Sequence, residues 1–132
     1  MPTDEERLRE AHLRAVTTAE ASAVRAAAAR AQQAGKRTMS NSIKVKQEGS
    51  NSIDYSIRGP GGMVEQLSFT LSWAPVAQGT PEAVGTMTVT TVVHRYLTVR
   101  SKMFGIPYGK PRVPALQSYR QFVEWMHKEL AS

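Results

Sequence analysis

The chain has 132 residues, a length typical of one domain that buries a core without disulfides or metals. It contains no cysteine, which excludes disulfides, thiolate nucleophiles and cysteine-ligated zinc. The net charge of +6 favours either an anionic partner, such as nucleic acid, an acidic protein or lipid headgroups, or a purely solubilising role for the charge.

No apolar run is long enough to cross a membrane. Asp4, Glu5 and Glu6 stand near the N-terminus, where a signal peptide would carry positive charge before an apolar stretch. We therefore expect a cytoplasmic protein.

Residues 3–34 are predicted to form one long, alanine-rich helix. Thr3 and Glu6 have the spacing of a capping box, and Gly35 supplies a stop. The apolar stripe of this helix is thin, so the helix either lies across a sheet with close backbone approach or projects and pairs with another chain. Our prediction is a docking or oligomerisation element over residues 1–35, joined to a compact domain over residues 40–132. Its contact residues would be Leu13, Val16 and Val24.

Strands are predicted in the middle of the chain. Residues 40–49 and 50–59 echo each other, each as a turn followed by alternating residues, which indicates a hairpin. After a break at Gly59 to Gly62, residues 64–73 alternate apolar and polar side chains and form a third strand. Residues 85–104 are rich in β-branched and aromatic residues. They form a long fourth strand that bends or bulges, or that stops near His94.

The last segments complete the predicted fold. Residues 106–114 hold three prolines, from which we expect no regular structure. A helix starts at about Pro114 or Ala115, and its apolar residues fall on one arc at helical spacing. The fold class is therefore α+β, in the order α-β-β-β-β-α, with a four-stranded, bent antiparallel sheet and an amphipathic C-terminal helix packed on it.

The histidines give little support for an enzyme. His12, His94 and His127 are far apart in sequence and have no metal-ligand spacing. A catalytic His94 would need a carboxylate from across the sheet, because none occurs between Glu82 and Glu124. We therefore predict a non-enzyme with no metal and no cofactor.

A basic surface is the strongest functional signal. Five basic residues and no acidic residue lie between residues 86 and 114. Basic side chains that neutralise phosphates, mixed with aromatic side chains that stack on bases, are how open sheets bind single strands. An ordinary solvated strand face has the same pattern. The predicted residues of the anionic-partner surface are Lys44, Lys46, Arg58, His94, Tyr96, Arg100, Lys102, Lys110 and Arg112.

A ligand pocket is the alternative. A bent sheet closed by the last helix can leave an apolar pocket for a small apolar or acidic molecule, lined by Phe69, Trp73, Met87 and Met103. Arg95, on the apolar parity of its strand, would reach such a ligand, pair with Glu65, or mark a bulge.

The preferred function is a non-catalytic binding or assembly module. It would self-associate or dock on a protein through its N-terminal helix and contact an anionic macromolecule through the basic face. Nucleic acid binding and small-ligand binding remain as alternatives.

Overall fold

The computed structural model describes residues 3–18, 20–38, 42–59, 64–75 and 87–131, without the side chains at 35–38, 101–102, 107–108, 110–111 and 131. These residues form three helices and seven strands. The elements are α1 Asp4–Glu10, β1 Arg14–Thr17, α2 Ala21–Thr38, β2 Ser42–Glu48, β3 Ser52–Arg58, β4 Glu65–Pro75, β5 Met87–Tyr96, β6 Val99–Met103, β7 Ile106–Arg112 and α3 Leu116–Ala131.

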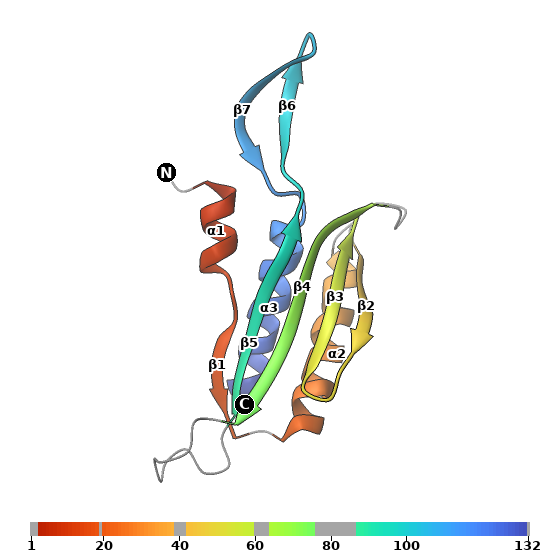
Figure 1. Ribbon diagram of the computed structural model, residues 1–132, viewed down its shortest axis with the longest axis vertical. Coiled ribbons are helices and arrows are strands. Elements are labelled where there is room, and N and C mark those ends of the chain that lie inside the picture. The colour runs from red at the N-terminus through yellow and green to blue at the C-terminus, as the bar shows by residue number, and fades with distance from the viewer. Residues whose placement is uncertain (1–2, 19, 39–41, 60–63, 76–86, 132) are drawn as a thin grey trace.

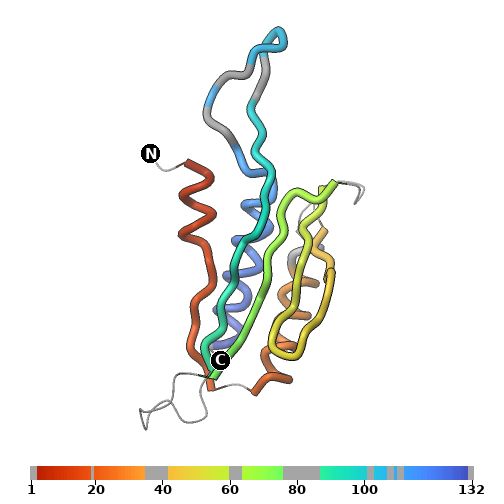
Figure 2. Tube along the Cα trace, viewed as in Figure 1, coloured from red at the N-terminus to blue at the C-terminus, as the bar shows by residue number. Residues whose placement is uncertain are grey.

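Five strands form one antiparallel sheet in the order β1-β5-β4-β3-β2. The strands β2 to β5 follow one another as a meander, whereas β1 joins at the far edge beside β5 (Figure 2). Helices α2 and α3 lie together behind the sheet, and no described helix covers its opposite face (Figure 1). In the described residues, no helix is both long enough and apolar enough to cross a membrane.

The core lies between the sheet and the two helices. Tyr55 and Phe69 from the sheet meet Tyr119 and Phe122 from α3, with contacting ring centroids 5.1 or 5.2 Å apart. The alternation predicted for residues 64–73 is confirmed from Leu67 to Trp73, because the apolar residues there are buried in the core shared with α3, whereas Val64 is exposed. The rings therefore fill much of the space in which the sequence suggested a ligand pocket.

The predicted helix over residues 3–34 is wrong. Helix α1 ends at Glu10, the chain then pairs with β5 as strand β1, and α2 begins only at Ala21. The backbone N–H of Leu13 donates to Oγ1 of Thr91, and the N–H of Thr91 donates to the carbonyl of Leu13. These bonds give partners to backbone groups at the edge of β5. Together with the burial of Leu13 they outweigh the local helix propensity.

Helix α2 packs inside the chain. Val24, Ala27, Ala28 and Ala31 are buried in the same core as the sheet and α3. Small side chains let the helix approach its neighbours closely. The sequence left open whether the helix packs closely on its own sheet or pairs with another chain, and this segment of it does the first. Residues of the predicted 1–35 element and of the 40–132 segment therefore share one core.

The region after residue 85 also differs from the prediction. The fourth strand of the meander, β5, ends at Tyr96, and residues 99–112 form a separate hairpin, β6–β7, that projects beyond the end of the sheet (Figure 1). The prolines did not prevent a strand in β7, because an isolated two-stranded hairpin has outer edges where a missing N–H costs no ladder bond. Met103 therefore lies on the hairpin rather than in the core, and the fifth strand of the sheet is β1.

Two predicted elements are confirmed. The β2–β3 hairpin pairs antiparallel, with Ile43 opposite Ile57 and Val45 opposite Tyr55. The C-terminal helix begins at Leu116 and buries its apolar arc against the sheet. Residues 60–62 of the predicted break at Gly59 to Gly62, and residues 85–86 at the start of the predicted fourth strand, lie outside the described residues.

Candidate anion-binding site on the open face of the sheet

The sheet face opposite α2 and α3 is called the open face below. The register places Lys44 opposite Ser56, Ser56 opposite Ser68, and Ser68 opposite Arg95. These four residues share the open face because their sequence neighbours Ile57, Leu67 and Phe69 are buried on the other face. Two cations thus stand at the ends of a row about 14 Å long, with two serines between them.

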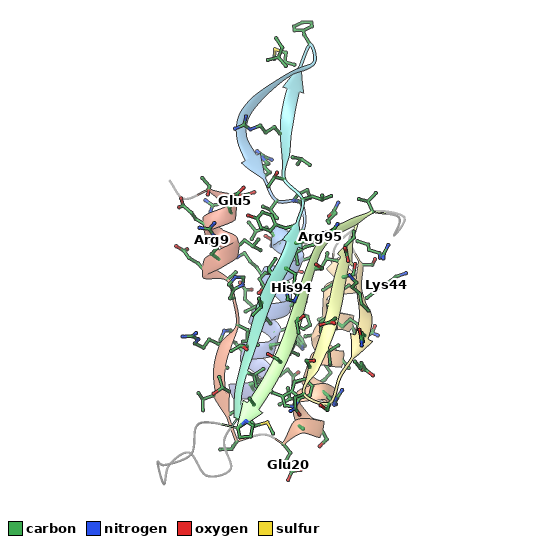
Figure 3. All side chains as sticks on the ribbon, viewed as in Figure 1. Glu5, Arg9, Glu20, Lys44, His94 and Arg95 are labelled. Carbon is green, nitrogen blue, oxygen red and sulfur yellow. The ribbon has the colours of Figure 1, made fainter. Side chains whose placement is uncertain are left out.

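A bulge in β5 shapes this site. Phe69 pairs with Val93 and Ser68 pairs with Arg95, so His94 is an extra residue between them. His94 and Arg95 therefore both lie on the open face, side by side in Figure 3. The bulge also places Tyr96 opposite the buried Leu67, which removes it from the predicted basic face. Of the three roles considered for Arg95, the bulge is confirmed.

The hydroxyl of Thr70 on β4 holds His94 and is itself held by Asp54 on β3. The hydroxyl of Thr70 donates to Oδ1 of Asp54 at 2.6 Å, and Nε2 of His94 lies 2.6 Å from the same hydroxyl oxygen. Because the Thr70 proton is directed to Asp54, Nε2 of His94 must be the donor in the second bond. The ring is thereby fixed in one tautomer, with Nδ1 left for a ligand or for water. The carboxylate that a catalytic His94 would need lies one hydroxyl away rather than in contact.

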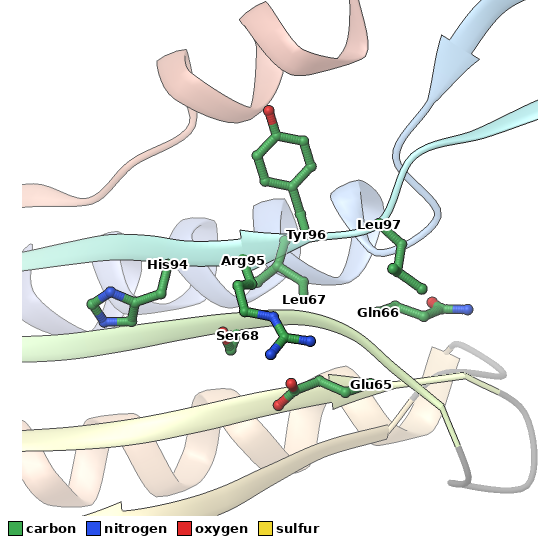
Figure 4. A pocket seen from close by; sticks show the side chains of 8 residues that line it. All are labelled: Glu65, Gln66, Leu67, Ser68, His94, Arg95, Tyr96 and Leu97. Carbon is green, nitrogen blue, oxygen red and sulfur yellow. The ribbon is translucent and has the colours of Figure 1, made fainter.

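An open pocket of about 270 Å³ adjoins this group at the end of β5 (Figure 4). In Figure 4 the guanidinium of Arg95 points toward the carboxylate of Glu65, and Tyr96 points away from both. The residues that line the pocket are Glu65, Gln66, Leu67, Ser68, His94, Arg95, Tyr96 and Leu97.

Glu65 moderates the positive charge of the open face. Its carboxylate lies 3.1 Å from the ammonium of Lys46. The nearby hydroxyl of Ser56 lowers the pKa of Glu65, with further lowering by Lys46 and by the charge of Arg95, against the opposing effect of burial. Glu65 is therefore anionic at neutral pH and neutralises part of the charge of Lys46 and Arg95.

The other predicted site residues divide between two places. Lys44 is exposed on β2, and Arg58 is half-buried on β3 opposite Glu65. Arg100 and Arg112 are exposed on the β6–β7 hairpin, away from the sheet. Lys102 and Lys110 lie on the same hairpin, and their side chains are outside the described residues. The structure therefore does not bring the predicted basic residues together on one face.

The predicted docking residues are divided as well. Leu13 and Val24 are buried at 1% and 0% exposure in the core of the chain, whereas Val16 is 66% exposed on β1. Burial removes Leu13 and Val24 as contact residues for a partner.

The prediction missed Arg14 as a cation of the open face. Arg14 pairs with Thr90, which lies opposite Ser72 on the open face. The β-branched run from Val16 to Thr18 was the available signal that this segment forms a strand.

No family model, curated protein or solved structure matches the chain. Within the described part of the chain, no three histidine, aspartate or glutamate side chains are placed to hold a metal ion. The open face carries the cations Lys44 and Arg95 beside serine and threonine hydroxyls.

Proposed function

We propose that the protein is a non-catalytic binding module that contacts an anionic macromolecule through the open face of its sheet. The observation that carries this proposal is the pair His94 and Arg95, which the bulge in β5 turns toward the same face as Lys44. A flat face without a covering helix gives an extended polymer room to lie across several strands, and basic side chains supply contacts to phosphate or sulfate groups.

The hydrogen bonds around His94 favour binding over catalysis. Thr70 and Asp54 come from two other strands and hold the imidazole in place before any ligand arrives. A pre-oriented side chain loses less conformational entropy on binding. The second ring nitrogen, Nδ1, is then an acceptor, placed to receive a hydrogen bond from a hydroxyl or N–H group of a polymer whose anionic groups contact Arg95.

Assembly through the N-terminal segment is not part of this proposal. Leu13 and Val24, two of the three residues predicted to make that contact, are buried inside the chain. A small-ligand pocket between the sheet and α3 is not favoured either, because Phe69 and Phe122 are in ring contact there.

The test is binding of a fluorescently labelled single-stranded oligonucleotide to the full chain, with heparin as a second polyanion. Arg95→Glu and Lys44→Glu should each lower the affinity about fivefold or more at low salt. Arg120→Glu, on α3, makes the same change in net charge away from the open face and should lower affinity by less than about twofold. Equal losses for Arg95→Glu and Arg120→Glu would show that only net charge matters and would refute the proposal.

A further inference from the structure

The β6–β7 hairpin carries an apolar tip. Met103 is 58%, Phe104 97% and Ile106 68% exposed, and all three belong to four consecutive residues around the turn. The hairpin projects from the end of the sheet, so the tip is the part of it farthest from the core (Figure 1). Exposed apolar clusters of this kind mark sites of contact with another molecule.

The turn holds Phe104 in a strained conformation. Met103 pairs with Ile106, so the loop has two residues, and Phe104 and Gly105 have φ values of 53° and 79°. Positive φ at both positions is typical of a type I′ turn, which favours Asn-Gly. A bulky aromatic residue is unfavourable there and is retained at the cost of stability. Strain combined with full exposure indicates that the ring has a function outside the folded chain.

The charges of the hairpin restrict what the tip can contact. Residues 99–112 include Arg100, Lys102, Lys110 and Arg112 and no acidic residue. A second copy of this chain is a poor partner, because its hairpin is equally basic and its net charge is +6. The partner surface must combine negative charge with an apolar layer beneath it.

Duplex nucleic acid fits the charge but not the tip. A ribbon of two strands is wider than the minor groove, which is about 6 Å across. The major groove admits such a ribbon, but its floor consists largely of polar base edges. Three adjacent apolar side chains would gain little there. The apolar tip therefore favours a lipid surface over duplex nucleic acid.

We propose that the β6–β7 hairpin inserts its tip into the surface of an anionic lipid bilayer. Met103, Phe104 and Ile106 enter the boundary between headgroups and acyl chains, which accepts apolar residues to a depth of about 5–10 Å. Arg100 lies four residues before Phe104, or about 13 Å along the strand, which places its level near the lipid phosphates. Arg112 pairs with Val99 and lies at a similar height on the other strand.

The backbone of the hairpin is compatible with this position. The two-residue turn closes the ribbon, and the strands pair directly beside it, from Met103 opposite Ile106 to Ser101 opposite Tyr108, so the inner N–H and C=O groups near the tip face each other. Pro107 and Pro111 remove two N–H groups from β7, which reduces the polar groups that insertion would strip of water. The site is separate from the open face of the sheet, and the two proposals stand independently.

The test is co-sedimentation of the full chain with vesicles, either of phosphatidylcholine alone or of phosphatidylcholine and phosphatidylserine in equal amounts. Wild type should bind the anionic vesicles and leave the neutral ones unbound. Phe104→Asn should lower the partition coefficient about tenfold or more. Asparagine suits the turn, so this variant keeps the hairpin.

Two matched controls separate the tip from general effects. Val92→Thr removes apolar surface from a residue that is 52% exposed on β5 and should bind vesicles like wild type. Arg100→Glu with Arg112→Glu should weaken binding more than Arg120→Glu combined with Arg9→Glu, which makes the same change in net charge elsewhere. Arg95→Glu should keep vesicle binding within about twofold of wild type, so loss of the open-face function and loss of hairpin function are distinguishable.

Three results would overturn the proposal. The first is equal binding of Phe104→Asn and wild type, and the second is failure of wild type to bind anionic vesicles at low salt. The third is an effect of Phe104→Asn on self-association measured by light scattering, without an effect on vesicles. That result would assign the tip to contact between copies of the chain.

Discussion

The phenol oxygen of Tyr119 on α3 lies 2.6 Å from Oγ1 of Thr91 on β5, and both side chains are buried. Oγ1 of Thr91 also accepts the N–H of Leu13, and the Tyr119 hydroxyl lies 2.8 Å from Nδ1 of His12. If the hydroxyl of Thr91 donates its proton to Tyr119, both hydroxyl protons of this hydrogen-bond network have an acceptor. Tyr119 then donates to His12, whose ring must be neutral.

This network predicts a loss of stability at acidic pH. Burial lowers the pKa of His12 below its ordinary value of 6.5. The unfolded chain therefore binds a proton before the folded chain does, so the His12 contribution is complete above about pH 6.5 and falls as the pH drops toward the folded-state pKa. His12→Asn keeps an acceptor near the position of Nδ1 and cannot titrate. Urea unfolding at several pH values should show a weaker acid dependence for His12→Asn than for His127→Asn, and parallel curves would contradict the assignment.

Leu13 and Val16 test the correction to the N-terminal helix. Both belong to the stripe predicted to dock on a partner, but Leu13 is buried and Val16 is 66% exposed. Leu13→Ala should lower the free energy of unfolding by about 2–5 kcal/mol, because it leaves a cavity in the core. Val16→Ala should cost about 1 kcal/mol or less. Similar small effects for both variants, measured by urea unfolding, would contradict the burial of Leu13.

Thr70 tests the hydrogen bonds that hold His94. Thr70→Val keeps the shape and strand preference of the side chain but removes the bonds to Asp54 and His94, so the free energy of unfolding should fall by about 1–2 kcal/mol. Thr88→Val, a half-buried residue on β5, is the matched control and should be nearly neutral. Nitrogen chemical shifts of His94 should report an Nε2–H tautomer in wild type and a mixture in Thr70→Val. An unchanged tautomer would show that Thr70 does not orient the ring.

Phe104 tests the strain in the hairpin turn. Phe104→Asn should raise the free energy of unfolding by about 1 kcal/mol, because asparagine tolerates positive φ. Phe104→Ala also removes the ring but remains unfavourable at this φ, so it should give no comparable gain. Equal stability of the two variants in urea unfolding would mean that the backbone at Phe104 is not strained.

Much of the sheet could be predicted because its pattern is local. Strand β4 alternates buried residues such as Leu67 and Phe69 with polar ones, and the arc of α3 repeats at helical spacing. The break after Glu10 could not be predicted in this way. Alanine content favoured a helix, whereas the decisive bonds join Leu13 to Thr91, 78 residues away.

The site was less accessible to prediction than the fold. A one-residue bulge at His94 reverses the parity of all later residues in β5, which exchanges the faces of Arg95 and Tyr96. Arg95 on the apolar parity was the local sign that a bulge was one possibility, but the position of the bulge depends on pairing with Ser68 and Phe69. The assignment of Arg100 to the sheet failed because the fourth strand ends at Tyr96 and the chain then forms a second hairpin.

The central claim is that the open face of the sheet contacts the polyanion. Backbone amide NMR spectra of the full chain, recorded as a short heparin oligosaccharide is added, test it most directly. The account predicts that the largest shifts follow the row Lys44, Ser56, Ser68 and Arg95, together with His94, and that they decrease as salt is added. Shifts confined to α2 and α3, or to the β6–β7 hairpin alone, would contradict it.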